Sequence, residues 1–459
     1  MTSAARVVRN VEADDAAGLR PGERLINLDD ALELAERLHR AGHLDDAEAI
    51  YGAVLERRPD DPVALHLSGV LRHQLGDSAR GAALIERAIA LRPQDPAAHN
   101  NLGNVLLEAG DVERAIDAYR ACLALAPDFA DTHNNLGTIH RARREHALAE
   151  ACYLRAIAIR PDFVDAHNNM ANLMLAQRRI DEAVIWSCKA VTLDPRHASA
   201  RRVLGMAHCS IGEYDKAADV YRAWLADEPD NPLALHHLAA CTGEQVPARA
   251  ADAYVESTFD GFAASFDAKL AKLDYRAPEL VAAAARARCG RALRALDVLD
   301  AGCGTGLCGP LVREHARRLE GVDLSQGMLN RAAARAAYDA LHRAELGAFL
   351  ATHAGAFDLI VSADTLCYFG VLDDLLRHAA SALRGEGLVV FTLEALIEGA
   401  GFRLQPHGRY CHARGYVEET LHNAGLETLS IEQHVLRQEG GLPVAGWLVA
   451  ARRKTAWPG

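Results

Sequence analysis

Three alternate glycines follow a short apolar run in the second half of this chain, in the segment DAGCGTG at residues 300–306. Glycines directly after a buried strand let the backbone turn tightly and approach a ligand without a Cβ atom in the way. Asp323, seventeen residues beyond the last of these glycines, closes the apolar run LEGVD. A carboxylate there can accept hydrogen bonds from both hydroxyls of a ribose, and it repels a phosphate. The two segments therefore predict a pocket for a ligand that contains a nucleoside.

The same segment also fits a second kind of ligand. Residues 304–309, GTGLCG, match the G-x-G-x-x-G fingerprint of dinucleotide-binding proteins. In that register the first glycine lies four residues beyond Asp300, so a charge would be buried in the turn without binding a phosphate. We also find no second domain for a hydride acceptor. In the other register the glycines are Gly302, Gly304 and Gly306. Asp300 then ends the strand near a ligand's ammonium group, so we favour a sulfonium amino acid that carries adenosine over NAD.

Strands and helices alternate around these residues and must position them. The apolar runs ALDVLDAG, LEGVDL, FDLIVSAD and GLVVFTLE are separated by helical stretches, which predicts a parallel sheet with helices on both faces. Two late runs, ETLSIEQHVLR and AGWLVAARR, flank QEGGLP and favour a terminal antiparallel pair. With HRAEL as the third strand, the sheet has seven strands.

The first half of the chain repeats itself with a period of 34 residues. The period is marked by six prolines, Pro59, Pro93, Pro127, Pro161, Pro195 and Pro229. Small residues recur 24 and 12 positions before each proline, and there two helices could cross closely. In four units of six, a tyrosine eight positions before the proline fills the gap beside these small residues. The residues between these marks follow helical spacing, and each proline ends the second helix of its unit.

This pattern resembles the tetratricopeptide repeat, with six helix–turn–helix units over about residues 28–231 and a closing helix near NPLALHHLAACTG. Such units bury their apolar faces only by stacking, so we expect an all-α superhelix with a concave groove that holds another chain. The expected division of the chain is a flexible segment at 1–27, the repeat array at 28–243 and the second domain at 244–459. The fold class is α + α/β.

Three consecutive first helices carry asparagine at the same point, Asn101, Asn135 and Asn169, within HNNLGN, HNNLG and HNNMAN. An asparagine side chain offers an acceptor and two donors, so a column of them can bind the backbone of an extended peptide. The column resembles the asparagine ladder in the repeats of the O-linked N-acetylglucosamine transferase, although it is shorter here. The alternative is that asparagine is only a common polar residue of the repeat. The accompanying histidines lie on helices too far apart to share a metal, and no metal site is expected.

The glycine segment and its flanking acids resemble the class I S-adenosylmethionine-dependent methyltransferases, over about residues 255–459. Further segments, among them FDLIVSADTLCYFG and GRYCHARGYV, narrow the resemblance to bacterial methyltransferases that carry tetratricopeptide repeats. It implies a Rossmann-like seven-stranded sheet and S-adenosyl-L-methionine as the cofactor. It also implies cofactor contacts from Leu324 beside Asp323, Glu345 and Leu346 at the adenine, and Asp364 near the sulfonium. Phe259 or Phe266 would cover the cofactor; the alternative for all of these is ordinary packing or a solvated charge.

Methyl transfer is an in-line displacement at an activated methyl group, so positioning can supply most of the acceleration and a general base is optional. The candidates for such a base lie past the fifth strand, at His407, Tyr410 and His412, with Tyr368 as a donor on the opposite loop. Each could equally be a surface residue. Arg409 and Arg437 could bind an acceptor's carboxylate through a bidentate fork or form surface ion pairs.

Composition and charge exclude several classes of protein. The formal net charge is −12, about −10 of it in residues 1–254, so we expect no nucleic-acid partner, because such binding depends on Lys and Arg at a phosphate backbone. Ten cysteines are spread without a C-x-x-C pair. No apolar run reaches the length of a membrane span and the first 25 residues lack a secretory signal, so a cytoplasmic location without a membrane partner is expected.

Together these features predict a methyltransferase whose repeat groove recruits a protein or peptide, with that polypeptide as partner or substrate. Two alternatives remain open. The enzyme could methylate a small metabolite while the repeats serve only assembly, or the chain could be a repeat scaffold with a cofactor-binding domain that does not catalyse.

Overall fold

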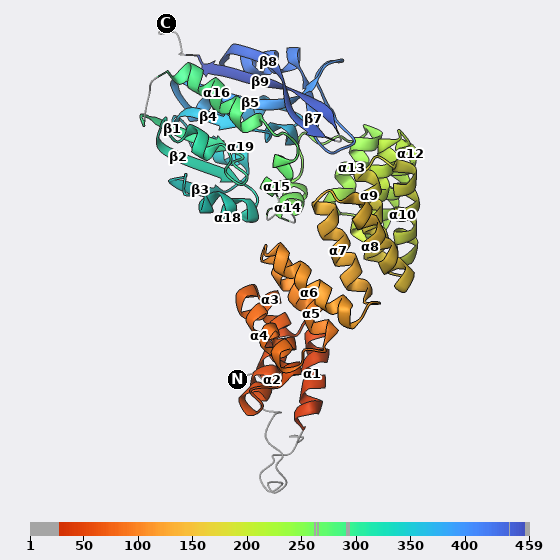
Figure 1. Ribbon diagram of the computed structural model, residues 1–459. Coiled ribbons are helices and arrows are strands. Elements are labelled where there is room, and N and C mark those ends of the chain that lie inside the picture. Colours follow the sequence, from red (N-terminus) through yellow and green to blue (C-terminus); the bar gives the residue numbers. More distant parts are fainter. Residues whose placement is uncertain (1–26, 261–262, 264–265, 291–293, 440, 455–459) are drawn as a thin grey trace, which may run out of the picture. The chain divides into compact units, whose positions relative to one another are not determined.

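The computed structural model describes residues 27–260, 263, 266–290, 294–439 and 441–454. The chain packs as two compact units (Figure 1). One unit runs to Gln177 and includes Ile185–Pro195, and the other comprises Arg178–Val184 together with Arg196–Gly459. The division therefore falls inside the repeat array, and the last repeat belongs to the same unit as the sheet.

Thirteen helices of the described chain form the repeat array and keep the 34-residue period of the sequence. The first helices of the six units and the closing helix are α1 (Leu28–Arg40), α3 (Pro62–Gln74), α5 (Pro96–Glu108), α7 (Ala130–Ala142), α9 (Val164–Ala176), α11 (Ala198–Ser210) and α13 (Pro232–Thr242). The second helices are α2 (Leu44–Arg57), α4 (Ser78–Leu91), α6 (Val112–Leu125), α8 (His146–Ile159), α10 (Ile180–Leu193) and α12 (Tyr214–Asp227). The predicted six units and closing helix are confirmed.

Close crossings inside the repeats explain the small residues. An ideal Cβ atom on Gly103 would lie 2.5 Å from Cε1 of Tyr119, and one on Gly137 would lie 2.6 Å from Cε1 of Tyr153. Both tyrosines are fully buried, so each ring occupies the space that the glycine of the first helix leaves open. The predicted role of the tyrosines in these units is confirmed.

The regular spacing of the array also gives its histidines a local role. The ring Nε2–H groups of His99, His133 and His167 donate to the carbonyl oxygens of the prolines six residues earlier, at 3.0, 2.8 and 2.8 Å. Each histidine therefore ties the start of one repeat to the end of the previous one. In the described part of the chain, no group of three or more His, Cys, Asp or Glu is arranged to hold a metal ion.

In the described residues the sheet has nine strands, two more than expected. They are β1 (Leu296–Ala301), β2 (Ala316–Asp323), β3 (Ala340–Arg343), β4 (Phe357–Ser362), β5 (Leu383–Leu396), β6 (Phe402–Leu404), β7 (Tyr410–Ala413), β8 (Leu426–Glu439) and β9 (Leu442–Arg453). The order β3-β2-β1-β4-β5 is parallel, and β9 pairs antiparallel with both β5 and β8. The predicted parallel sheet with a terminal antiparallel pair is confirmed, and the third strand lies slightly earlier than HRAEL.

The two additional strands form a short hairpin at the carboxyl end of β5. Residues 388–394 of β5 pair with β9 and residues 394–396 pair with β7, so Glu394 belongs to both ladders. In turn, β7 pairs with β6. Because β5 is 14 residues long, it extends past the core of the sheet and offers an edge to a second partner. The segment GRYCHA, in which we placed candidate bases past the fifth strand, is thus partly a strand.

Helices cover both faces of the sheet, as predicted. On one face Phe349 of α19 (Leu346–Ala351), Leu375 of α20 (Asp373–Ala382) and Val417 of α21 (Arg414–Asn423) pack into one apolar core. On the other face, Val281 of α16 (Ala277–Cys289) and Val312 of α17 (Gly309–Val312) pack into a second. No helix among the described residues combines the length and apolarity that crossing a bilayer requires.

Within the second unit, α13 packs directly on the β6–β7 hairpin. The Nε2–H of His236 donates to the carbonyl oxygen of Gly408 at 2.8 Å, and its ring stacks on Tyr254 of α14 (Asp252–Asp260) with centroids 3.9 Å apart. Burial lowers the pKa of His236, which keeps the ring neutral in this contact. Gly243 caps the last helix of the array, and the packing continues from α13 onto the hairpin and α14.

Candidate functional site

A cavity opens at the carboxyl ends of β1, β2, β3 and β4, with about 960 Å³ of empty space including the solvent at its mouth. Its lining includes eight of the nine residues that the sequence predicts to bind the cofactor, namely Asp300, Gly302, Gly304, Asp323, Leu324, Glu345, Leu346 and Asp364. The ninth, Gly306, is not among the lining residues. The tertiary structure therefore brings segments from four strand ends to one site, as parallel strands predict.

Each of the three glycines is required for a different reason, although all have positive φ. A Cβ atom on Gly302 would lie 2.2 Å from the side chain of Thr365, and one on Gly306 would lie 2.9 Å from the ring of Tyr338. A Cβ atom on Gly304 would meet nothing within 4 Å, because that face of the turn is open. Gly302 and Gly306 thus serve packing, and Gly304 provides the bare backbone surface that the sequence predicted.

Asp300 is almost fully buried, with 1% of its surface exposed. Its Oδ2 accepts a hydrogen bond from the hydroxyl of Tyr338 at 2.6 Å, while its Oδ1 is buried with no partner among the described residues. Burial raises the pKa of Asp300 to about 7, and the nearby carboxylate of Asp323 contributes in the same direction. An unpartnered buried carboxyl oxygen is costly unless a ligand satisfies it. This atom therefore indicates that the cavity takes a hydrogen-bond donor.

Asp323 lies at the end of β2 and joins the two loops that frame the cavity. Its Oδ2 accepts the backbone N–H of Gly304 and its Oδ1 accepts that of Ser325, both at 2.9 Å. Burial nevertheless raises its pKa above the ordinary value. Each carboxylate oxygen accepts more than one hydrogen bond, so both keep capacity for a pair of ligand hydroxyls.

Tyr338 is a site residue that the sequence analysis missed. It follows α18 (Gln326–Ala334), and its ring fills the space beside Gly306, Gly309 and Gly321, where added Cβ atoms would approach it to between 2.6 and 3.1 Å. The ring is wedged there with its hydroxyl on Asp300. No local pattern marks it, because its partners are dispersed over β1, β2 and α17.

The segment before the sheet covers the cavity, as predicted for Phe259 and Phe266, and both line it. Phe259 lies edge-on to Tyr368, with ring centroids 5.4 Å apart, and to Phe266 at 6.0 Å. Tyr368 belongs to the short 3-10 helix Leu366–Tyr368. Three aromatic rings from separate segments therefore exclude water from one side of the cavity.

Polar contacts hold the covering helices in place. Asp267 of α15 (Phe266–Ala271) accepts from the hydroxyl of Thr305 at 2.5 Å and from Arg335, whose Nε also donates to the carbonyl oxygen of Thr305 at 2.6 Å. Asp260, at the end of α14, accepts from the Ser325 hydroxyl. Asp260 and Asp267 directly follow the two phenylalanines in FDGFAASFDAKL. Their position next to the predicted covering residues is a signal by which the sequence could have identified them as site residues.

Glu345 and Leu346 stand at the start of α19, at the predicted adenine side of the cavity. The side chain of Glu345 caps that helix by accepting the backbone N–H groups of Gly347 at 2.9 Å and Ala348 at 2.6 Å. Leu346 is buried with its side chain in the apolar core next to α20. Both residues line the cavity, and Glu345 is held rigidly by its capping role.

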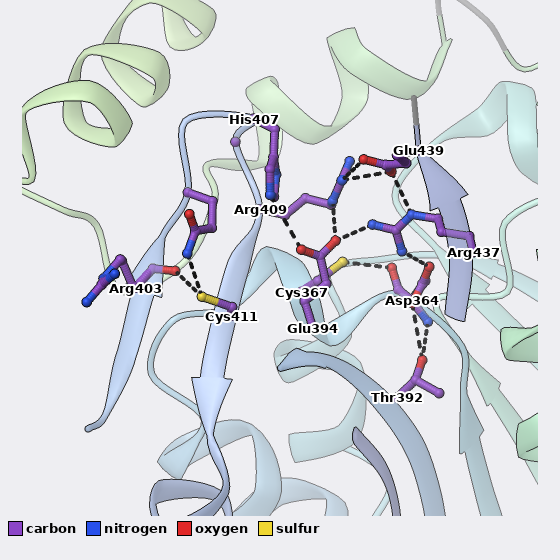
Figure 2. A network of polar contacts seen from close by, with 12 residues as sticks. Asp364, Cys367, Thr392, Glu394, Arg403, His407, Arg409, Cys411, Arg437 and Glu439 are labelled. Atoms are coloured by element: carbon purple, nitrogen blue, oxygen red, sulfur yellow. Dashed lines mark hydrogen bonds and ion pairs between the residues drawn. The ribbon is translucent and has the colours of Figure 1, made fainter. Parts of the chain in front are cut away.

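Asp364 lies beside the cavity but is not a free carboxylate. Figure 2 shows it at one end of a buried charged network with Glu394, Glu439, Arg409 and Arg437. Arg437 is 4% exposed and donates to Asp364 at 2.5 Å, to Glu394, and to Glu439 at 2.6 Å.

Arg409 closes this network by donating to Glu394 at 2.5 Å and to Glu439 at 2.7 Å. We expected Arg409 and Arg437 either to bind an acceptor's carboxylate or to form surface ion pairs. Both expectations are wrong, because the two side chains form ion pairs with carboxylates inside the domain. The reason is tertiary: the ends of β5, β7 and β8 converge and enclose both guanidinium groups among three carboxylates.

None of the three predicted general bases is among the described residues that line the cavity. Tyr410 is fully buried and donates to the carbonyl oxygen of Pro247 at 2.8 Å. His412 is also fully buried, with Nε2–H donating to the carbonyl oxygen of Gly370 at 3.1 Å. Both are therefore structural residues, because β7 inserts them between the sheet and its neighbours.

His407 lies near the charged network, with Nε2 3.6 Å from Oε2 of Glu394. Burial lowers the pKa of His407 to about 4, and the neighbouring Arg409 contributes in the same direction. The prediction that His407 acts on a substrate receives no support from its position. Of the predicted catalytic residues, only Tyr368 lines the cavity.

Comparison with known families identifies both parts of the chain. Residues 298–387 match a family model described as a methyltransferase domain. Residues 32–96, 69–130 and 198–241 match models described as tetratricopeptide repeats. Residues 115–185 match a model described as an Est1 DNA/RNA binding domain, and the helices there keep the period of their neighbours. The chain therefore carries a tetratricopeptide-repeat array followed by a methyltransferase domain.

Solved structures resemble parts of the chain. MamA is 24% identical, with 36% of this chain and 96% of that chain covered and a TM-score of 0.32. The pilF protein of Pseudomonas aeruginosa is 17% identical, with 46% and 96% covered and a TM-score of 0.41. YrrB, described as a TPR protein with an unusual peptide-binding site, is 22% identical, with 40% and 96% covered and a TM-score of 0.33. Among curated proteins, no match to this chain is found.

Proposed function

We propose that this protein is an S-adenosylmethionine-dependent methyltransferase whose repeat groove recruits a polypeptide partner or substrate. The observation that carries the cofactor assignment is the unpartnered buried Oδ1 of Asp300, a residue that lines the cavity together with Gly304 and Asp323. A cationic amino acid joined to a ribose satisfies both acids. A pyrophosphate would place negative charge between them.

The third glycine of the dinucleotide register supports the same choice. In Rossmann proteins the glycines of this fingerprint serve the turn, the approach of the pyrophosphate and helix packing. Here a Cβ atom on Gly309 would lie 2.6 Å from Cζ of Tyr338, so the ring of Tyr338 occupies that side of the turn. Tyr338 also occupies the space beside Gly306. The register built on Gly302, Gly304 and Gly306 therefore accounts for the geometry better than NAD binding does.

When bound, S-adenosylmethionine would supply a methyl group that its positive sulfur already activates. Asp300 would hold the ammonium group and Asp323 the ribose hydroxyls, while Phe259 and Phe266 would exclude water. Burial raises the pKa of Tyr368 well above its ordinary value, so its hydroxyl stays protonated and can orient an acceptor by hydrogen bonding without removing a proton. Catalysis in this site would rest on positioning, with the acceptor entering as its neutral form.

Titration calorimetry of the full chain tests the cofactor assignment directly. We expect S-adenosylmethionine to bind with micromolar affinity, while NAD binds at least tenfold more weakly. A host lysate supplied with the chain and with tritiated S-adenosylmethionine should then incorporate label into protein. Binding of NAD in the absence of S-adenosylmethionine binding would overturn the assignment, and label found only in small molecules would overturn the polypeptide substrate.

The affinity for the cofactor should depend on pH through Asp300. Its pKa of about 7 in the empty site means that the carboxyl is largely protonated below that pH, whereas an ammonium group prefers the ionised form. Affinity should therefore fall about tenfold per unit below pH 7. The Tyr338 hydrogen bond lowers the pKa of Asp300, so Tyr338→Phe should move the break to higher pH. Calorimetry from pH 5.5 to 8.5 measures the affinity of the wild type and of Tyr338→Phe. If the affinity of the variant begins to fall at the same pH as that of the wild type, the proposed role of this hydroxyl is contradicted.

The asparagine ladder supports recruitment of a polypeptide and also shows a structural role. Asn169 donates through Nδ2 to Oδ1 of Asn134 at 2.9 Å, and Asn135 donates in the same way to Asn104 at 2.8 Å. Asn101 contacts Nε2 of His66 at 2.9 Å. Each ladder residue thus uses one N–H group of its side-chain amide in a contact with the preceding repeat. In the described chain the Oδ1 atoms of Asn135 and Asn169 have no such contact and are available to accept from a peptide backbone.

This double role dictates a paired test of the groove. Asn135→Ala with Asn169→Ala removes two inter-repeat bonds and two of the three ladder residues, and we expect methylation of a protein acceptor to slow at least about tenfold. The control, Asn104→Ala with Asn134→Ala, removes the same two inter-repeat bonds from the acceptor side and leaves the ladder in place. It also removes the hydrogen bond that the Tyr119 hydroxyl donates to Asn104 at 2.7 Å. Its rate should stay within about twofold of the wild type. Equal rates for the two double variants, measured with the tritiated cofactor, would leave the groove without a role in recruitment.

A further inference from the structure

Two thiols face each other in the last repeat, outside the site described above. Cys209 is the penultimate residue of α11 and Cys241 the penultimate residue of α13. Their Sγ atoms lie 3.0 Å apart, and both residues are partly exposed. A disulfide bond is about 2.05 Å long, so roughly 1 Å of approach separates the two side chains from a covalent link.

The regular period of the array shows that packing does not demand thiols here. The four preceding units carry Leu175, Arg141, Leu107 and His73 at the position of Cys209. They carry Ala207, Leu173, Ile139 and Val105 at the position of Cys241. Aliphatic side chains therefore fill the position of Cys241 in all four of these units. Among the units compared, both positions hold cysteine only where α11 meets α13.

We propose that Cys209 and Cys241 form a reversible disulfide in response to a two-electron oxidant such as hydrogen peroxide. The Cys241 thiolate attacks the peroxide, giving a sulfenic acid and hydroxide. The Cys209 thiol then displaces the sulfenic oxygen as water and forms the S–S bond. Both sulfurs are oxidised, the peroxide is reduced to two water molecules, and a dithiol reductant reverses the step.

The contact between the two thiols favours a thiolate within this pair over one at Cys188. Either sulfur can donate in the hydrogen bond between them, and with Cys209 as the donor the bond lowers the pKa of the Cys241 thiol. Burial raises the pKa of Cys188, the exposed cysteine of the described chain. A thiolate reacts with peroxide and a thiol does not. Cys241 therefore reacts before Cys188 although Cys188 is more exposed.

The link would act on the part of the array that adjoins the methyltransferase sheet. α11, α12 and α13 belong to the same compact unit as the sheet, and α13 contacts the β6–β7 hairpin through His236 and Gly408. A disulfide closes the segment between residues 209 and 241, which holds all of α12. Oxidation would thus fix the last repeat against local opening.

Peptide mapping of the full chain tests the proposal. Trypsin places Cys209 in residues 203–216 and Cys241 in residues 223–249, with one cysteine in each peptide. After treatment with a slight excess of hydrogen peroxide, we expect a product equal to the sum of these peptides less two hydrogens, which dithiothreitol separates. The oxidised protein should also show a Tm several degrees higher.

Two variants keep this test decisive. Cys209→Ser and Cys188→Ser each remove one thiol, but only the first should abolish the linked product and the Tm increase. Brief labelling with limiting iodoacetamide at pH 7.5 should modify peptide 223–249 at least fivefold faster than peptide 180–189, which holds Cys188. Faster labelling of peptide 180–189, or peroxide oxidation that leaves 203–216 and 223–249 unlinked, would overturn the proposal.

Discussion

Gly304→Val is expected to weaken binding of S-adenosylmethionine at least about 100-fold, a loss of about 2.7 kcal/mol. The backbone of Gly304 has φ of +53°, and a Cβ atom there would meet no protein atom within 4 Å. The three added carbons would therefore occupy the cavity where the cofactor is proposed to lie. Methyl transfer should fall in proportion when the cofactor concentration is below its dissociation constant.

A β-branched residue at positive φ also strains the backbone, by about 1–3 kcal/mol, so the cavity effect needs a matched control. Gly355 has φ of +63°, likewise with nothing within 4 Å of an added Cβ atom, and lies in an exposed loop outside the cavity. Gly355→Val should carry the same strain and keep the wild-type affinity within about twofold. If both variants bind S-adenosylmethionine equally well in calorimetry, the glycine turn is not the cofactor site.

Arg437→Met is expected to lower the free energy of unfolding by about 3–5 kcal/mol, because it leaves buried carboxylates without their partner. Arg437 links Asp364, Glu394 and Glu439, and the first two of these lie in the interior with it. For a unit of this size the loss corresponds to a decrease in Tm of roughly 10 °C. Arg437→Lys keeps the charge but not the planar set of donors, so it should recover part of the loss.

Arg452→Met provides the comparison on the neighbouring strand. Arg452 pairs with Glu427 at 2.7 Å, and the two side chains are 40% and 50% exposed. An exposed pair of this kind contributes at most about 1 kcal/mol, so the Tm should change by no more than a few degrees. Thermal unfolding followed by circular dichroism measures both variants. A similar small change in each would show that the buried network does not stabilise this unit.

The repeat array could be predicted in detail because its information is local. The proline period, the small residues and the tyrosines recur at fixed spacing, and each unit contacts only its neighbours. The sequence therefore predicted six units and a closing helix, and it predicted that a tyrosine fills the gap in four of the units. The glycine turn with Asp300 and Asp323 could be predicted for the same reason, since a strand, a turn and the next strand contain it.

The sequence by itself determined the periodic array, the parallel sheet and the acids and glycines of the cavity. Only the tertiary structure decided the partners of those acids: Tyr338 on Asp300 and Arg437 on Asp364 come from segments 38 and 73 residues away. It also showed that β7 buries Tyr410 and His412, which removes them from any substrate. The physical reason is that these contacts depend on strand pairing and on the convergence of strand ends. Spacing along the chain carries no information about either, whereas turns and repeats recur with residue types at fixed positions.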